Sequence, residues 1–290
     1  MKRVLWLSGA ALTFAALIFL FKIAAPPLEN HPLPPSTQQQ KAGVPGTYTE
    51  RKLLPPISPD QYLSYTENAA HQTSNVLMFD GMRRFYQTYN GATSPERVKA
   101  VIVLLHGAGR SGVSLVEKWR MTADKKQIFL IGPSTSGRYW PASNPDSYGF
   151  IDAVIKDAYE KYGLKPDLPL YLFGHSSGAI YALEYTVRHP EKFDAVAIHA
   201  GRLAGLAGLK HMDSAQKLPP ITIINGTQDG EFPLSDVRPS AKVLAYRGFN
   251  VHLYILEGHT HWYYTLAPYI NALAWKGFTE EDVTPAGAVP

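Results

Sequence analysis

The fold is decided by residues 170–179, which read Leu170-Tyr171-Leu172-Phe173-Gly174-His175-Ser176-Ser177-Gly178-Ala179. The first four residues form a short apolar run typical of a buried β-strand. A helical pattern follows from about Ser177 to Arg188 and ends before Pro190. Gly-x-Ser-x-Gly therefore stands where the chain must reverse between a strand and a helix. A plain glycine-rich turn is the alternative, and the strand and helix on either side argue against it.

Ser176 is the residue that this reversal presents. Gly174 and Gly178 prevent clashes on either side, so the central residue can take a strained conformation that lifts its Oγ out of the fold. The N-terminus of the following helix points at the site and favours developing negative charge. Ser177 lacks glycines at the required spacing. The segment therefore predicts that Ser176 is a nucleophile.

Short apolar runs alternate with helical patterns along the rest of the chain. The runs are brief, β-branched and unbroken, as in parallel strands covered on both faces. They cover Arg84–Tyr89, expected as an early edge strand, and Ala100–Leu105, Gln127–Ile131, Leu170–Phe173, Ala195–Ile198, Ile221–Ile224 and Val251–Leu256. Helices are expected over Phe150–Tyr162, Ser177–Arg188, Val237–Arg247 and Leu266–Trp275. The predicted fold class is α/β, with a mostly parallel central sheet flanked by helices and no large cap.

A glycine-rich loop, His106–Gly112, follows the predicted strand at 100–105. A tetrahedral intermediate needs preorganised N–H donors. Where a serine nucleophile stands on such a turn, one donor belongs to the residue after it, here Ser177, and the other to the loop after an early strand, here Ala108. The same loop also spells Gly-x-Gly-x-x-Gly, the pattern of a dinucleotide site. That site requires an acidic residue at the end of the next strand, and Ile131-Gly132 provides none.

The predicted acid is Asp229, on the turn after the strand at 221–224. A catalytic triad needs a carboxylate to hold the imidazole tautomer and to stabilise its cation. Asp229 comes between Ser176 and the C-terminal histidines, which is the chain order of hydrolases built on such a sheet. Asp236 is the alternative acid, and a simple turn aspartate is the remaining interpretation.

The base must lie on the loop after the last strand, and two histidines are found there. His259 directly follows Gly258, and His261 lies two residues further on. Their spacing does not separate them. A metal site through His259-x-His261 is a third interpretation, but no third ligand is evident, so we expect no metal and no cofactor. Four other histidines lie in motif or packing positions and are expected to be structural: His106, His175, His189 and His199.

These motifs resemble those of the α/β-hydrolase superfamily, from about Arg84 to Trp275. They are most similar to the esterase branch that includes esterase D, the polyhydroxyalkanoate depolymerases and the feruloyl esterases. The matching segments are His106-Gly107-Ala108-Gly109, Gly174–Gly178, Gly226-Thr227-Gln228-Asp229 and Glu257–Tyr264. The esterase D-like motif Glu-Gly-x-x-His-x-Tyr-Tyr implies His261 as the base, whereas the depolymerase-like pattern implies His259. The resemblance implies an esterase, and we take His261 as the base.

Three aromatic residues lie on loops near the predicted active-site edge: Tyr139, Trp140 and Trp262. They are candidates to bind an aromatic or extended acyl group, and aromatic packing is the alternative. Only the short stretch Arg202–Pro220 is available as a lid. The acyl and alcohol specificity does not follow from the sequence, and neither does the oligomeric state.

The N-terminus has the pattern of an export signal. Lys2 and Arg3 precede an apolar run from Val4 to Phe21 that is long enough to span a bilayer. The expected organisation is a signal-anchor or cleaved signal peptide over 1–25, a proline-rich linker and lead-in over 26–75, a catalytic domain over 76–278 and a loose tail over 279–290. We expect the domain to face the periplasm or the exterior, either membrane-anchored or secreted.

Composition narrows the function classes. The chain has 290 residues, a net charge of +4 and no cysteine, which excludes disulfides and a thiol nucleophile. Lys and Arg are scattered, so no nucleic-acid partner is expected. The predicted function is hydrolysis of small-molecule or polymer carboxylic esters through an acyl-enzyme. The alternatives are a serine peptidase of the same fold and a catalytically inactive binding protein on that fold.

Overall fold

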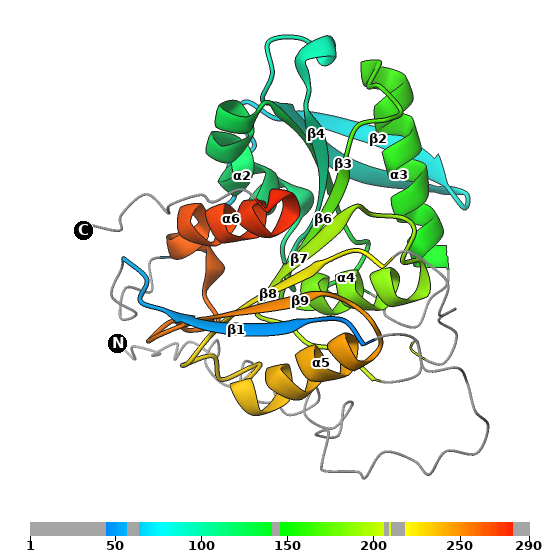
Figure 1. The fold of residues 1–290 in the computed structure, drawn as a ribbon. Coiled ribbons are helices and arrows are strands. Elements are labelled where there is room, and N and C mark those ends of the chain that lie inside the picture. The colour runs from blue at the N-terminus through cyan, green and yellow to red at the C-terminus, as the bar shows by residue number, and fades with distance from the viewer. Residues whose placement is uncertain (1–44, 57–63, 141–145, 206–208, 210–217, 281–290) are drawn as a thin grey trace, which may run out of the picture. The chain divides into compact units, whose positions relative to one another are not determined.

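A computed structural model describes residues 45–56, 64–140, 146–205, 209 and 218–280. In this part of the chain nine strands form one sheet, in the order β1-β9-β8-β7-β6-β4-β5-β3-β2 (Figure 1). The strands are β1 (Tyr48–Leu53), β2 (Thr73–Phe79), β3 (Met82–Asn90), β4 (Ala100–Leu105), β5 (Ile128–Pro133), β6 (Leu170–His175), β7 (Ala195–His199), β8 (Ile221–Gly226) and β9 (Val251–Leu256).

The sheet is mostly parallel, as predicted. Across the sheet, each neighbouring pair between β1 and β5 is parallel. The pairs β5–β3 and β3–β2 are antiparallel. Every residue of β4, β5, β7 and β8 is buried. Helices cover both faces of a parallel sheet and leave neither face to water. Apolar residues therefore run continuously along these strands instead of alternating with polar ones.

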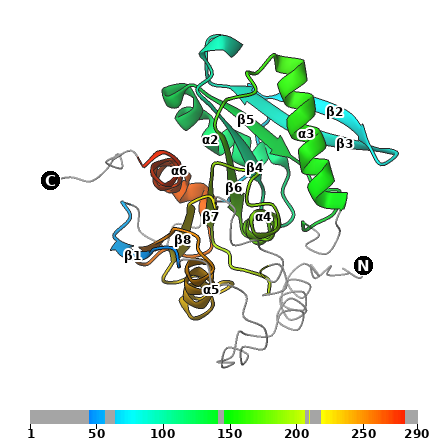
Figure 2. The same ribbon diagram turned by 45° about the vertical axis from the view of Figure 1, so that its right-hand side comes forward.

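Within the described ranges, five α-helices pack on the two faces of the sheet (Figures 1 and 2). They are α2 (Gly112–Lys126), α3 (Asp146–Tyr162), α4 (Ser177–Arg188), α5 (Leu234–Tyr246) and α6 (Tyr263–Thr279), with a 3-10 turn at Pro95–Arg97. Side chains of α2 and α6 share one buried apolar cluster, and those of α3, α4 and α5 share the other. The sheet therefore forms the middle of three layers, as expected.

Four elements differ from the sequence expectations. The strand predicted over Arg84–Tyr89 is β3, which is not the edge of the sheet because β2 pairs outside it. Strand β1 lies inside the segment expected to be a linker, and it pairs in parallel with β9 along its whole length. Helix α2 was not predicted. Strand β2 was not predicted either. The two missed strands, β1 and β2, lie at the edges of the sheet and are mostly exposed, so they lack the apolar pattern of a buried strand.

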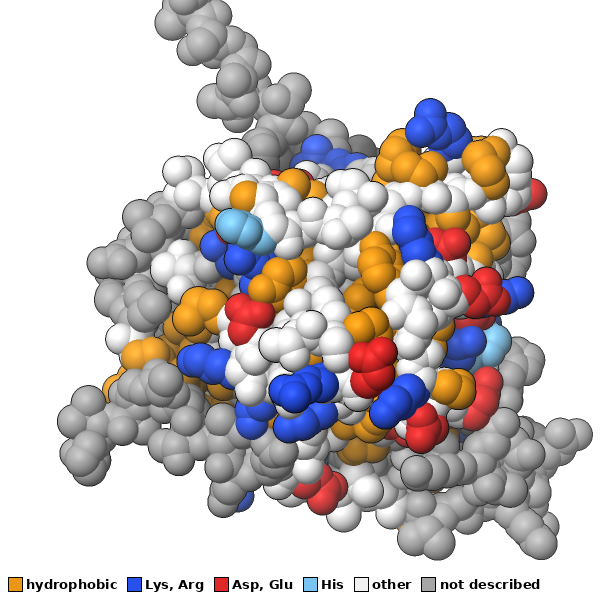
Figure 3. All heavy atoms as spheres, turned by 90° about the horizontal axis from the view of Figure 1, so that it is seen from above, with side chains coloured by type: hydrophobic (Ala, Val, Ile, Leu, Met, Phe, Trp, Pro, Cys, Tyr) orange, Lys and Arg blue, Asp and Glu red, His pale blue; other side chains and the backbone are white. Residues whose placement is uncertain are grey.

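The predicted N-terminal segment, residues 1–25, lies outside the described residues, as does most of the predicted tail at 279–290. None of the helices in the described ranges is long and apolar enough to cross a bilayer. On the face drawn in Figure 3, Lys and Arg side chains lie among Asp and Glu side chains rather than in a basic block.

Candidate active site

Ser176 lies at the sharp turn between β6 and α4. Its φ of 55° and ψ of −118° are a strained combination for a residue with a side chain. The flanking glycines are required by close contacts. A Cβ on Gly174 would lie 2.3 Å from the Gly178 carbonyl oxygen, and one on Gly178 would lie 2.1 Å from the Leu105 carbonyl oxygen. The structure thus gives Gly-x-Ser-x-Gly the geometry that the sequence predicted.

Ser176, His261 and Asp229 form one line of hydrogen bonds. His261 Nε2 lies 2.9 Å from Ser176 Oγ, and His261 Nδ1 lies 3.0 Å from Oδ2 and 3.2 Å from Oδ1 of Asp229. A carboxylate can only accept, so Nδ1 carries the proton and Nε2 accepts from the serine hydroxyl. This tautomer allows His261 to remove the proton of Ser176.

Asp229 is held on the turn after β8. Its side chain is fully buried, and Oδ1 also accepts from the backbone N–H groups of Glu231 and Phe232, each at 2.9 Å. These two hydrogen bonds fix the orientation of the carboxylate. Asp236, the alternative acid, lies on α5, and its Oδ2 is 3.7 Å from Nε of Arg202. The structure therefore brings Asp229, and not Asp236, to the histidine.

His259 points away from the nucleophile. Its Nε2 lies 2.9 Å from Nε2 of His199, a buried residue at the end of β7. Burial lowers the pKa of His259 to about 4, although the nearby Asp229 carboxylate acts in the opposite direction. Two residues spaced i and i+2 on this loop thus face different partners, and only His261 reaches Ser176. In the described ranges, no cluster of three or more candidate metal ligands is found.

The predicted oxyanion donors lie on either side of the nucleophile. Ser177 is the first residue of α4, so its N–H has no acceptor within the helix. Ala108 lies on the loop after β4. Its neighbour Gly107 lies close to the sharp turn at Ser176, the elbow between β6 and α4. A Cβ on Gly107 would lie 3.4 Å from Ser176 Cβ. No acceptor for either N–H was found among the described residues. Their role as oxyanion donors therefore stays a prediction from the sequence.

The third glycine of the Gly-x-Gly-x-x-Gly pattern has a packing reason. A Cβ on Gly112 would lie 1.8 Å from the Gly132 carbonyl oxygen, because α2 begins in contact with β5. Gly109 has φ of 68°, which favours glycine. His106 braces the loop, since its Nε2 accepts from the Thr135 N–H at 3.2 Å. Each of these contacts serves the loop itself, and none depends on a bound nucleotide.

The three candidate substrate-binding aromatics differ in position. Trp140 is 5% exposed, and its Nε1–H donates to the His106 carbonyl. It therefore packs against the glycine-rich loop His106–Gly112, here called the oxyanion loop, instead of facing a ligand. Tyr139 and Trp262 are half-buried. The guanidinium of Arg110, on the loop after β4, lies 5.9 Å from the ring centre of Trp262 and 5.1 Å from that of Tyr264.

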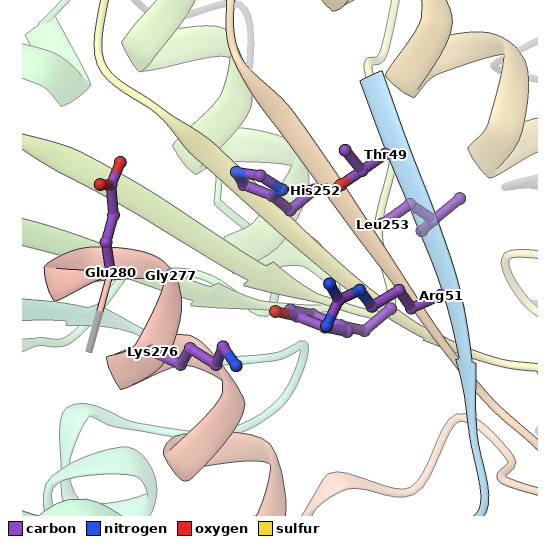
Figure 4. Close-up of a pocket in the computed structure, with 8 residues that line it drawn as sticks. Thr49, Arg51, His252, Leu253, Lys276, Gly277 and Glu280 are labelled. Atoms are coloured by element: carbon purple, nitrogen blue, oxygen red, sulfur yellow. Dashed lines mark hydrogen bonds between the residues drawn. The ribbon is translucent and has the colours of Figure 1, made fainter. Parts of the chain in front are cut away.

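A separate hollow of about 530 Å³ lies between β1, β9 and the end of α6. Figure 4 shows Arg51 of β1 and Lys276 of α6 extending toward each other across it. No residue of the hydrogen-bonded line or of the oxyanion loop lines this hollow.

Known proteins match this chain in structure and not in sequence. No protein-family profile and no curated protein matches. An S-formylglutathione hydrolase from Agrobacterium tumefaciens is 17% identical, with a TM-score of 0.56 over 73% of this chain and 97% of its own. A fluorophosphonate-binding serine hydrolase from Staphylococcus aureus is 15% identical, with a TM-score of 0.57 over 70% of this chain and 97% of its own. A thermostable esterase is 18% identical, with a TM-score of 0.55 over 72% of this chain, which covers 62% of the esterase.

These structures share their fold with this chain over about 70% of its length. The chain has the α/β-hydrolase fold. Matches of this low identity establish the fold alone, because one fold supports many activities. Activity must be argued from the arrangement of Ser176, His261 and Asp229.

Proposed function

We propose that this α/β-hydrolase-fold protein is a serine hydrolase that cleaves carboxylic esters. The observation that carries the proposal is the line from Ser176 Oγ through His261 to Asp229, with both hydrogen bonds at or below about 3 Å. The strained turn at Ser176 adds support, because a serine held there has its hydroxyl directed out of the fold.

Acylation begins when Ser176 Oγ attacks the ester carbonyl carbon and its proton passes to Nε2 of His261. The new oxygen anion accepts hydrogen bonds from the N–H groups of Ala108 and Ser177. Asp229 stabilises the imidazolium. The carbon–oxygen bond to the alcohol then breaks, and His261 returns its proton to the leaving alcohol. An acyl-enzyme on Ser176 remains.

Deacylation repeats the same steps with water. His261 takes a proton from water as the water oxygen attacks the acyl carbon. The second tetrahedral intermediate collapses, the bond to Ser176 Oγ breaks, and the serine regains its proton from His261. The carboxylic acid leaves. Each step uses side chains and N–H groups of this chain only.

The substrate class we propose is a small-molecule or polymer carboxylic ester. Three structural neighbours are named an esterase, an S-formylglutathione hydrolase and a serine hydrolase. All three names are consistent with acyl transfer to a serine. We propose Tyr139 and Trp262, whose side chains are half-buried, as contacts for the acyl or alcohol group.

Fluorophosphonate labelling combined with a panel of p-nitrophenyl acyl esters, aryl esters and peptides tests this function. We expect labelling at Ser176 and turnover of esters, with both lost in a folded Ser176→Ala variant. Ser177→Ala is the matched control and should keep part of the activity, because its backbone N–H remains. Full ester turnover by Ser176→Ala would refute the mechanism. Preference for peptides would instead indicate a peptidase, and neither label nor turnover an inactive hydrolase-fold protein.

We also propose that residues Val4–Phe21 direct export and hold the catalytic domain at a membrane, outside the cytoplasm. The support is the sequence itself, with Lys2 and Arg3 before the apolar run. Fractionation and protease treatment of intact cells test the proposal. The domain should be degraded from outside, or be found free if the segment is cleaved. A soluble, protease-protected, full-length cytoplasmic protein would contradict it.

A further inference from the structure

Three buried histidines outside the triad form a second hydrogen-bonded line. His175 Nδ1 lies 3.0 Å from His199 Nδ1, and His199 Nε2 lies 2.9 Å from His259 Nε2. His175 ends β6, His199 ends β7 and His259 lies on the loop after β9. All three are at most 6% exposed. The acylation steps above use none of these three imidazoles.

The line is held by neutral rings. Burial lowers the pKa of His175 and of His199 well below the usual value, and neighbouring histidines lower both further. A neutral imidazole has one donor and one acceptor nitrogen. His199 must therefore donate to one neighbour and accept from the other. Both hydrogen bonds are then satisfied at once, with one direction along the whole line.

The line connects the parts that must meet for catalysis. The His199 carbonyl accepts from the Ser176 N–H at 3.0 Å, so His199 also fixes the nucleophile's backbone. The His259 carbonyl accepts from the Gln228 N–H at 2.9 Å, one residue before Asp229. His261 follows two residues after His259. The histidines thus bridge the elbow after β6 and the two loops that carry the acid and the base.

We propose that His199 and His259 are positioning residues, which hold the loop of His261 at hydrogen-bonding distance from Ser176. The loop after β9 and the elbow after β6 are separated in the sheet by β8 and β7, so their register is not set by direct strand pairing. The buried hydrogen bonds across the ends of these strands set it instead. This inference rests on the proposed hydrolase function.

Variants that remove or retain these hydrogen bonds test the proposal. His199→Phe and His259→Leu remove them, and His259→Gln keeps a polar group near the position of Nε2. His252→Leu, in β9 and outside the line, is the matched control. We expect His199→Phe and His259→Leu to lower kcat on a p-nitrophenyl ester by about 10- to 100-fold, because misplacement of about 1 Å has effects of this size. KM should change by less than about 2-fold.

Recovery by the conservative variant separates positioning from simple packing. His259→Gln should regain most of the lost kcat and most of the lost rate of fluorophosphonate labelling, and His252→Leu should match the wild type. Wild-type kcat in folded His199→Phe and His259→Leu would overturn the inference, as would equal losses in His259→Gln and His259→Leu. If His199→Phe does not fold, the His259 pair decides. A wild type without label or turnover would refute the proposed function itself, and this inference with it.

Discussion

At the scale of single residues, the rings of His259 and His261 have different partners although they lie two positions apart. His261 lies between Ser176 and Asp229, whereas His259 contacts His199. We expect His261→Ala to lower kcat by about 10³-fold or more, as loss of a triad member does. His259→Ala should lose far less. Steady-state kinetics on one ester measures both, and a large loss confined to His259→Ala would show that the assigned base is wrong.

The same pair of histidines shows how far the sequence could predict this site. Ser176 and Asp229 could be found because each follows a recognisable buried strand, and strand ends in a parallel sheet lie along one edge. Spacing could not choose between His259 and His261, since both follow the last strand. The line through His199 was not predicted either. Its hydrogen bonds join residues far apart in the sequence. From the sequence alone, a histidine at a strand end is equally consistent with a side chain that only packs in the core.

At the scale of elements, the elbow depends on the close approach of α4 to β4. A Cβ on Gly178 would lie 2.1 Å from the backbone oxygen of Leu105, so α4 must shift in Gly178→Ala. We expect this variant to lose about 1–3 kcal/mol of stability, the usual cost of overpacking, and to lose esterase activity as Ser176 moves. Gly137→Ala is the matched control, because no atom lies within 4 Å of its added Cβ. Thermal unfolding and ester turnover measure both, and equal behaviour of the two variants would contradict the expectation.

The elements themselves were predictable in proportion to their burial. Strands β4 and β9 match the predicted ranges at both ends, since both are largely apolar runs that are buried along almost their whole length. Strand β1 was missed because its middle residues are exposed and it is held by backbone pairing with β9. Helix α2 was not predicted, although its buried residues Leu115, Val116, Trp119 and Ala123 recur at the spacing of an amphipathic helix. Its N-cap, Ser111, was a second available signal.

At the scale of the whole molecule, buried neutral histidines link stability to pH. Burial lowers the pKa of both His106 and His259 to about 4, and that of His175 and His199 well below the usual value. In the unfolded chain a histidine has a pKa of about 6.5. Between these values the unfolded state binds more protons than the folded state. Their contribution is therefore fully present above about pH 6.5 and is lost as the pH falls toward 4.

We therefore expect Tm to fall steadily as the pH is lowered from about 6.5 to 4.5. A pKa lowered from about 6.5 to about 4 corresponds to on the order of 3 kcal/mol for a buried histidine such as His259, and each kcal/mol shifts Tm by about 2–4 °C in a domain of this size. Calorimetry at stepped pH measures the slope. His259→Gln should show a shallower slope than the wild type, because one buried site no longer takes up a proton on unfolding. A Tm that is constant over this range, or equal slopes in both proteins, would show that His259 is not held neutral by burial.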